Sequence, residues 1–91
     1  MRGRLDGKVA LISGTGGGQG RAAALRFARD GARVFGCDID EQAQQETLAL
    51  ARAEGLAVAG SAGFDLSDPA QASGWIEAAV AQYGQIDILY N

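Results

Sequence analysis

The sequence predicts an α/β fold in which helices cover both faces of a doubly wound parallel sheet, in the order β-α-β-α-β-α-β. Short apolar runs alternate with stretches of helical periodicity, and strands joined by connections of helical length pair in parallel through right-handed crossovers. A cluster of glycines also stands between the first apolar run and the first helical stretch. With 91 residues, 47% hydrophobic and 21% charged, the chain is long enough for one small globular domain with a thin core.

The N-terminal part of the sequence predicts two strands and a helix. Residues 9–12 are apolar at every position, which is typical of a strand buried on both faces. Residues 19–30 have helical periodicity, and Gly31 stands where that helix would end. The alanines at 22–24 would let the helix lie close to the sheet, and residues 33–37 form the second apolar strand.

The second helix is expected to begin at or near Asp40 and to end at about Glu54, before Gly55. A third, less regular strand follows at 56–61. The face of the helix that is expected to be buried consists of Ala43, Thr47, Leu50 and Ala51.

The segment SDPAQ predicts the start of a third helix. Asp68 would cap this helix, with Pro69 in the first helical position and Gln71 closing a capping box. Ser67 is a competing cap.

The remainder of the chain is expected to contain the body of this helix and one more strand. Gly84 would end the helix, and residues 86–90 form a fourth strand. The apolar positions that recur at three- and four-residue steps on the helix are Ala72, Ile76, Ala79, Val80 and Tyr83.

The composition argues against several functions. A net charge of −3, with the arginines scattered among acids, leaves no basic face for nucleic acid. The longest apolar run is far shorter than the ~20 residues that span a bilayer, so neither a membrane segment nor a secretory signal is expected. The absence of histidine excludes Ser-His-Asp and Cys-His catalysis within this chain and leaves a poor ligand set for zinc. Cys37, the single cysteine, is expected to be a small apolar strand residue rather than a reactive thiol, and a chain without a possible disulfide suits a reducing cytoplasm.

The glycines fall at the junction between the first strand and the first helix. Gly14, Gly18 and Gly20 have the spacing that a tight turn needs when backbone N–H groups must approach phosphate oxygens. The helix N-terminus would add unpaired donors and a partial positive charge. A flexible turn is the alternative, but the position after a buried strand and before a helix favours a pyrophosphate site.

Asp38 stands at the end of the second strand, 18 residues after Gly20. A dinucleotide-binding fold places an acid near this point to accept hydrogen bonds from the adenosine ribose hydroxyls. The same carboxylate would repel a 2′-phosphate, which favours NAD over NADP, and no basic residue follows it at Asp40 or its neighbours. A solvated acid at a strand end is the alternative for Asp38, and Asp40 is expected to be only a helix cap.

Four unusual residues each follow a predicted strand. Because the carboxyl ends of parallel strands share one edge of a sheet, they are expected to converge on one ligand site. Asp65 has a second interpretation, as an Asx-turn residue before the third helix. The four residues are Gly14, Asp38, Asp65 and Asn91.

The sequence resembles the short-chain dehydrogenase/reductase family over essentially its whole length. The resemblance implies a Rossmann-type sheet and covers the N-terminal, cofactor-binding part of the family's domain. It rests on LDGKVALISG at 5–14, similar to the family's first strand; SGTGGGQG at 13–20, similar to its TGxxxGxG loop; CDID at 37–40, similar to its acid-bearing second strand; FDLSD at 64–68, similar to its adenine-contacting segment; and IDILYN at 86–91, similar to the strand that leads into its NNAG motif.

The resemblance also implies residue roles in binding NAD. Asp38 would hold the adenosine ribose, and Ile39 would flank the adenine. Asp65, with the backbone of Leu66, would meet the adenine edge. The pyrophosphate and nicotinamide-ribose side would be lined by Gly14, Gly17, Gly18 and Gln19, and Asn91 would lie near the cofactor ribose.

The chain departs from the family most in what it lacks. The family's chemistry uses a Ser, a Tyr and a Lys four residues after that Tyr, whereas here Asp87 stands four residues after Tyr83 and the single lysine is Lys8. Tyr83 is therefore expected to pack on a helix face. Ser13 replaces the usual Thr but keeps a hydroxyl, and Gln19 replaces a usual apolar residue, which would alter contacts to the diphosphate.

The sequence is therefore expected to be the N-terminal NAD-binding portion, residues 1–91, of a longer cytoplasmic oxidoreductase. That protein would transfer hydride between the nicotinamide and an alcohol or ketone, as a homo-oligomer, without nucleic-acid or membrane partners. The segment alone is expected to be inactive, and it is not expected to fold robustly because a parallel sheet ending on an apolar strand leaves an exposed edge. Two alternatives are a non-enzymatic nucleotide-binding module and an S-adenosylmethionine-dependent methyltransferase, which also places glycines after its first strand and an acid after its second.

Overall fold

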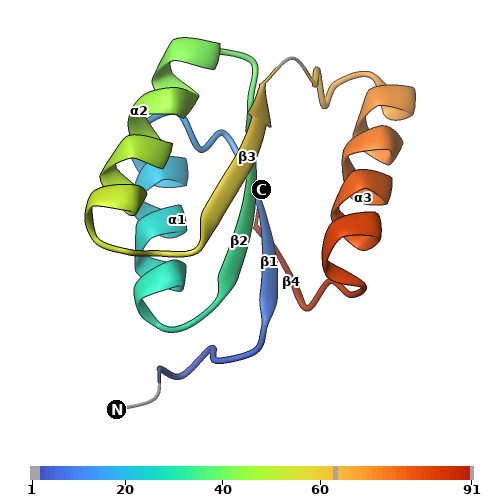
Figure 1. The fold of residues 1–91 in the computed structure, drawn as a ribbon. Helices are drawn as coiled ribbons and strands as arrows, with labels where there is room; N and C mark the ends of the chain where they lie inside the picture. The colour runs from blue at the N-terminus through green and yellow to red at the C-terminus, as the bar shows by residue number, and fades with distance from the viewer. Residues whose placement is uncertain (1–2, 63, 91) are drawn as a thin grey trace.

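A computed structural model describes residues 3–62 and 64–90 of the chain; Asn91 lies outside them. Its centre is a sheet of parallel strands in the order β3-β2-β1-β4, which confirms the doubly wound α/β fold (Figure 1). β1 pairs with β2 and β4, so the first strand lies inside the sheet. The strands are β1 (Val9–Ser13), β2 (Arg33–Asp38), β3 (Val58–Ala62) and β4 (Ile88–Tyr90).

Three helices form the outer layers. α1 (Gly18–Arg29) and α2 (Glu41–Ala53) lie together on one side of the sheet, and α3 (Pro69–Tyr83) covers the other (Figure 1). No helix in the described part of the chain has both the length and the hydrophobicity that crossing a lipid bilayer requires.

β1 divides the core into two layers. Its side chains alternate between faces, so Val9 and Leu11 pack toward α3 while Ala10 and Ile12 pack toward α1. All four are fully buried, as expected for a strand covered on both sides. The α3 layer also contains Phe35, Cys37, Trp75 and Ala79, whereas the α1 layer contains the smaller Ala24, Ala28, Ala32 and Val34.

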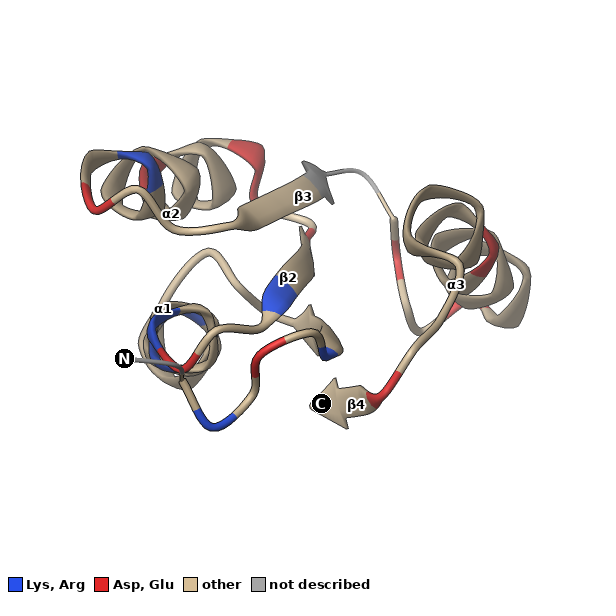
Figure 2. Ribbon diagram, turned by 60° about the horizontal axis from the view of Figure 1, so that its bottom comes forward, with Lys and Arg blue, Asp and Glu red and all other residues tan. Residues whose placement is uncertain are grey.

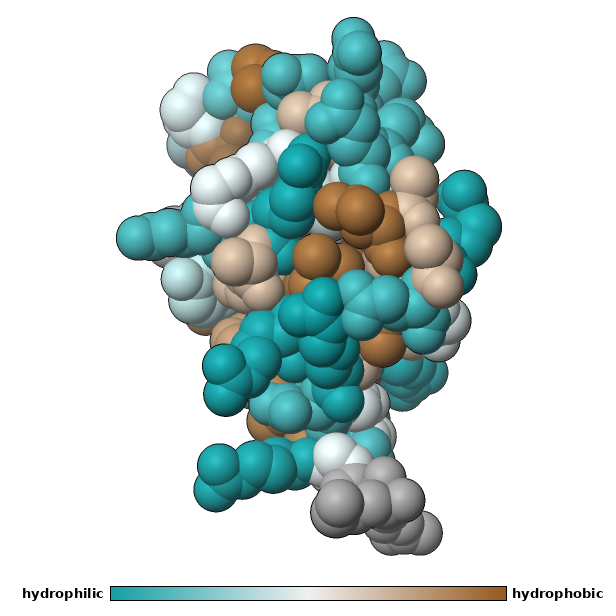
Figure 3. Space-filling view, turned by 90° about the vertical axis from the view of Figure 1, so that its left-hand side faces the viewer, coloured by the Kyte–Doolittle hydropathy of each residue, from teal (hydrophilic) through white to brown (hydrophobic). Residues whose placement is uncertain are grey.

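The buried face of α2 differs from the sequence prediction. Thr47 and Ala51 are buried as expected, but Leu50 is 45% exposed and Gln44 is fully buried in its place. Gln44 fits because β3 carries a glycine under it: a Cβ on Gly60 would lie 1.8 Å from Gln44 Nε2. Viewed from the side of α1 and α2, the surface shows hydrophobic side chains exposed among hydrophilic ones (Figure 3).

The buried face of α3 only partly matches the prediction. Ala79 is buried as predicted, but Trp75 is also buried, whereas the predicted Ile76 and Val80 are 39% and 45% exposed. The ring of Trp75 stacks against that of Phe35 on β2, so the largest side chain of the helix decides which face turns to the sheet.

The cap of α3 is Asp68, as predicted, because its carboxylate accepts a hydrogen bond from the Ala70 N–H at 2.9 Å. The competing cap, Ser67, is not used. The predicted capping box is wrong: Gln71 accepts from the Asp65 N–H at 2.8 Å, while the Asp68 N–H bonds the Asp65 carbonyl. Gln71 also donates its side-chain amide to the Asp68 carboxylate at 3.2 Å, so it joins the cap of the helix to the preceding turn.

Several boundaries shift by one or two residues. The third strand begins at Val58 rather than at 56, because Leu56 bonds back to the carbonyl of Ala51 and completes the end of α2. The fourth strand begins at Ile88 rather than at 86, and the Asp87 carboxylate accepts the Val9 N–H at 2.8 Å where a backbone carbonyl would otherwise serve.

Candidate functional site

The carboxyl ends of β1 and β2 open into a pocket of about 240 Å³. Its lining brings together five residues that the sequence predicted to bind one ligand, although they are spread over more than 50 positions of the chain. These are Gly14, Asp38, Ile39, Asp65 and Leu66, joined by Ser13, Cys37 and Phe64. The expected convergence at one edge of the sheet is therefore present for these residues.

The glycine loop crosses this edge between β1 and α1. Gly14 and Gly18 have φ values of 71° and 56°, a left-handed conformation that favours glycine. A Cβ on Gly20 would lie 1.9 Å from the carbonyl oxygen of Gly14, so only a glycine lets α1 begin this close to the loop. The loop is thus a compact turn rather than a flexible linker.

The N-terminus of α1 has no side-chain cap. Its N-cap residue, Gly17, makes no capping hydrogen bond, and the first turn contains no acidic residue. The other two helices, by contrast, are capped by Asp40 and Asp68, as predicted for both. Within the described residues, the first N–H groups of α1 are therefore not engaged by a carboxylate, and they suit an anionic group at the mouth of the loop.

Asp38 lies between the loop and α2. One carboxylate oxygen accepts the Gly16 N–H at 2.7 Å, and the other accepts the Asp40 N–H at 2.8 Å. These two bonds fix the orientation of the carboxylate, while each oxygen keeps a lone pair for a further donor. None of the residues that line the pocket is basic.

Asp65 forms the turn before α3 that was its second interpretation from the sequence, and it also lines the pocket. Its carboxylate accepts the N–H of Ser67 at 3.0 Å and the hydroxyl at 2.6 Å. These hydrogen bonds from Ser67 hold the pKa of Asp65 below its usual value, so the residue is a carboxylate at neutral pH. Ile39, which is 73% exposed, supplies an apolar wall at the pocket mouth.

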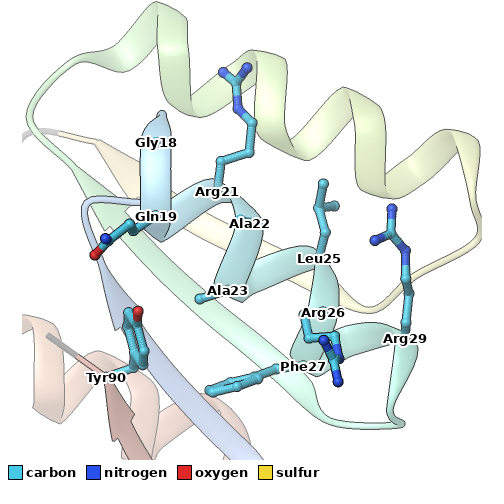
Figure 4. Close-up of a pocket in the computed structure, with 10 residues that line it drawn as sticks. All are labelled: Gly18, Gln19, Arg21, Ala22, Ala23, Leu25, Arg26, Phe27, Arg29 and Tyr90. Atoms are coloured by element: carbon cyan, nitrogen blue, oxygen red, sulfur yellow. The ribbon is translucent and has the colours of Figure 1, made fainter.

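Gly18 and Gln19 lie on a second and larger cavity, of about 830 Å³, between α1 and the end of β4 (Figure 4). Tyr90 forms its opposite wall and packs edge-on against Phe27. The exposed Gln19 side chain extends toward the Tyr90 side of this cavity (Figure 4). The predicted site residues are thus divided between two neighbouring cavities. The exposed Gly17 lies between the loop and the helix, and Asn91 lies outside the described residues.

A polar network behind the loop was not predicted from the sequence. Arg21, taken as one of the scattered surface arginines, reaches from α1 to both the loop and α2. Thr15 donates its hydroxyl hydrogen to the amide oxygen of Gln44, and Thr47 donates to the Thr15 carbonyl at 2.5 Å. The signal in the sequence that could have indicated this network is the glycines of β2 and β3, which make room for it. A Cβ on Gly36 would lie 2.5 Å from the Thr15 hydroxyl oxygen.

The two side chains that were candidates for reactivity have structural roles. Burial raises the pKa of the Cys37 thiol, which contacts the Phe64 carbonyl at 3.7 Å, so it is a protonated apolar residue as expected. Tyr83 packs on Phe35, and burial raises the pKa of its hydroxyl. It is therefore a helix-face residue rather than a general base.

Charge is distributed unevenly between the two helical layers. α1 carries three arginines, whereas α3 contains no lysine or arginine (Figure 2). The basic residues of α1 are Arg21, Arg26 and Arg29.

Comparisons of the chain with a family model and with individual proteins indicate the same family. The family model for short chain dehydrogenase matches residues 8–91. The chain is 40% identical over 88 residues to a sorbitol dehydrogenase of Cereibacter sphaeroides and 39% identical over 88 residues to a D-threitol dehydrogenase of Mycolicibacterium smegmatis; each match covers 97% of this chain. This match favours the dehydrogenase interpretation of the glycine loop over the methyltransferase.

Solved structures agree with the sequence relatives. A short chain dehydrogenase/reductase from Burkholderia phymatum in complex with NAD superposes with a TM-score of 0.88 at 39% identity, covering 93% of this chain and 30% of that one. A hydroxysteroid dehydrogenase from Escherichia coli has a TM-score of 0.88 at 32% identity and covers 94% of this chain and 36% of that one. The chain spans only 33% and 34% of the sorbitol and D-threitol dehydrogenases.

Proposed function

The chain belongs to the short chain dehydrogenase family, and from that premise we propose that it is the NAD-binding portion of an oxidoreductase. The observation that carries the proposal is the position of Asp38, whose oriented carboxylate faces a pocket beside the glycine loop. The full-length protein would transfer hydride between the nicotinamide of NAD and an alcohol or ketone. The relatives named as sorbitol and D-threitol dehydrogenases support an alcohol as the substrate class.

The adenosine half of the cofactor fits the smaller pocket. Asp38 would accept hydrogen bonds from the ribose hydroxyls, with the adenine between Ile39 on one side and Asp65 and the Leu66 backbone on the other. Carboxylate hydrogen bonds of this kind are charge-assisted, and the same charge would repel a 2′-phosphate. NAD is therefore proposed in preference to NADP.

The diphosphate would lie over the glycine loop. No atom lies within 4 Å of the position that a Cβ would take on Gly14, Gly17 or Gly18, so a diphosphate can approach the backbone there. The Gly14 N–H itself donates to the Cys37 carbonyl at 2.8 Å, so the free donors and the positive end of a helix dipole would come from the start of α1. Gln19, at the next position, would offer its side-chain amide to the diphosphate or nicotinamide ribose, and Asn91 would lie near that ribose. When bound, NAD supplies the carbon that accepts or donates the hydride.

The reaction also needs groups that this chain does not contain. We place the Ser, the Tyr and its partner Lys in a further part of the full-length protein, in agreement with the small fraction of its relatives that the chain spans. A cytoplasmic location and a homo-oligomeric state belong to the same proposal. The exposed apolar residues Ile76 and Val80 on α3 and Leu89 on the edge strand β4 support packing against further structure.

Calorimetric titration of the full-length protein with NAD and with NADP tests the proposal. We expect NAD to bind at least about tenfold more tightly, because a charge-assisted hydrogen bond contributes about 1.5–3 kcal/mol. Asp38→Asn should weaken NAD binding about tenfold or more and narrow the gap to NADP, whereas Asp40→Asn, the matched control two residues away, should leave both affinities unchanged. Equal or tighter binding of NADP would overturn the cofactor preference, and binding of neither would overturn the function.

A further inference from the structure

Gly16, in the middle of the glycine loop, is held on both sides of its backbone. Its N–H donates to Asp38 at 2.7 Å, and its carbonyl accepts from the Arg21 guanidinium at 2.6 Å. A Cβ at this position would lie 2.6 Å from the Asp38 carboxylate, so the loop is pressed against that side chain. The orientation of the Gly16 backbone is therefore linked to the carboxylate proposed to bind the ribose.

Arg21 ties this loop residue to α2. Its guanidinium donates through Nε to the Thr47 hydroxyl at 2.8 Å and through Nη2 to the Ala43 carbonyl at 3.1 Å. A weaker ion pair with Glu46 at 3.2 Å lies toward the solvent. One side chain thus joins the start of α1, the glycine loop and the first turns of α2.

A second connection lies below the first, in the buried layer. Thr15, Gln44 and Thr47 are all fully buried polar residues. Thr15 is bonded through its hydroxyl to the Gln44 amide and through its carbonyl to the Thr47 hydroxyl. Because buried polar groups lose free energy when they lack a partner, displacing α2 from the loop would be costly.

Arg29 provides an internal comparison. It is also an α1 arginine that reaches toward α2 (Figure 4), and it forms two hydrogen bonds to Glu54, at 2.6 and 2.8 Å. This pair lies at the far end of the helices and is exposed, and within the described residues Arg29 bonds no residue of the glycine loop. The two arginines thus make the same kind of helix-to-helix link, but only Arg21 also holds the glycine loop.

We propose that Arg21, with Thr47 and Gln44 of α2, forms a loop clamp that positions the glycine loop for the dinucleotide. The proposal rests on the proposed NAD-binding function. Without the clamp, the peptide between Gly16 and Gly17 is free to rotate, which misdirects the Gly17 N–H and the following N–H groups from the diphosphate. Arg21 is a positioning residue in this scheme, and α2 becomes part of the cofactor site although no residue of its helical body lines the pocket.

The test uses the full-length protein with Arg21→Met and the matched control Arg29→Met. Calorimetry with NAD separates affinity from the folded fraction, because a loss of folded protein lowers the stoichiometry and leaves the dissociation constant unchanged. Hydrogen exchange of residues 14–20 without NAD reports the loop directly. Arg21→Lys is the conservative variant, since its ammonium can restore one bond to the Gly16 carbonyl.

We expect Arg21→Met to raise the dissociation constant for NAD about tenfold, with faster exchange in the loop, and Arg29→Met to change neither. Arg21→Lys should restore part of the affinity. An unchanged dissociation constant for Arg21→Met, with or without a loss of thermal stability, would overturn the clamp, as would equal effects of the two methionine variants. If the wild-type protein binds no NAD, the cofactor function fails, and the exchange data still decide whether Arg21 orders the loop.

Discussion

α1 and α3 cover opposite faces of the same sheet, yet their N-termini are built in opposite ways (Figure 1). α3 has an aspartate cap and a proline in its first turn, whereas α1 has Gly17 at its N-cap and therefore no capping side chain. The cap of α3 neutralises the positive end of its dipole within the chain. The start of α1 leaves that end available at the mouth of the glycine loop.

The two helices also differ in how tightly a glycine inside each of them is packed. A Cβ on Gly20 in α1 would collide with the Gly14 carbonyl, whereas a Cβ on Gly74 in α3 would make an ordinary contact of 3.5 Å with Phe64. A glycine inside a helix lowers the stability of the helix relative to alanine, so its presence needs a reason. Of these two glycines, Gly20 has such a reason in its close packing against the loop, and Gly74 does not. The start of α1 is thus packed closely against the glycine loop, whereas α3 serves mainly to bury the sheet.

The largest expected effect comes from adding one methyl group at Gly20 of α1, and the same change at Gly74 of α3 is its control. Gly20→Ala should destabilise the full-length protein by about 3 kcal/mol and abolish measurable NAD binding, because the loop backbone must move to relieve the clash. Gly74→Ala should instead be neutral or stabilising by up to about 1 kcal/mol. Denaturant unfolding and NAD titration measure both, and a Gly20→Ala protein with wild-type affinity would remove the distinction between the helices.

A second change gives α1 the kind of cap that α3 has. Gly17→Asp should raise stability by a few tenths of a kcal/mol through capping but weaken NAD binding about tenfold or more, since the new carboxylate would face the diphosphate. Gly17→Asn supplies a neutral cap and should keep most of the affinity. If both variants weaken binding equally, the effect is steric, and the argument from charge is wrong.

The smallest effect is expected when the cap of α3 is removed. Asp68→Ala should lower the free energy of unfolding by about 1 kcal/mol, while the dissociation constant for NAD stays within about twofold of wild type. Asp68→Asn, which keeps a capping oxygen, should recover most of the stability. A tenfold loss of affinity in Asp68→Ala would mean that the start of α3 also belongs to the cofactor site.

Local sequence patterns predicted most of the fold. The fully apolar run at 9–12 and the cap residues Asp40 and Asp68 all have the expected roles, because each depends on neighbours within a few residues. Patterns failed where partners come from far along the chain. The burial of Trp75 in place of Ile76, and of Gln44 in place of Leu50, is set by contacts with β2, β3 and the glycine loop.

The candidate site shows the same difference between what local sequence patterns predict and what long-range contacts decide. The order of residues along the chain is enough to show which of them follow each strand, and parallel pairing then brings Gly14, Asp38 and Asp65 to one edge. The positions of Arg21 and Gln44 behind the loop depend on tertiary packing, because the bonds from Arg21 to Thr47 and from Thr15 to Gln44 join residues 26 and 29 positions apart and need α2 seated over two glycine-bearing strands. Spacing along a chain encodes which strand end a residue occupies, whereas the contacts between helix and loop exist only once the layers have packed.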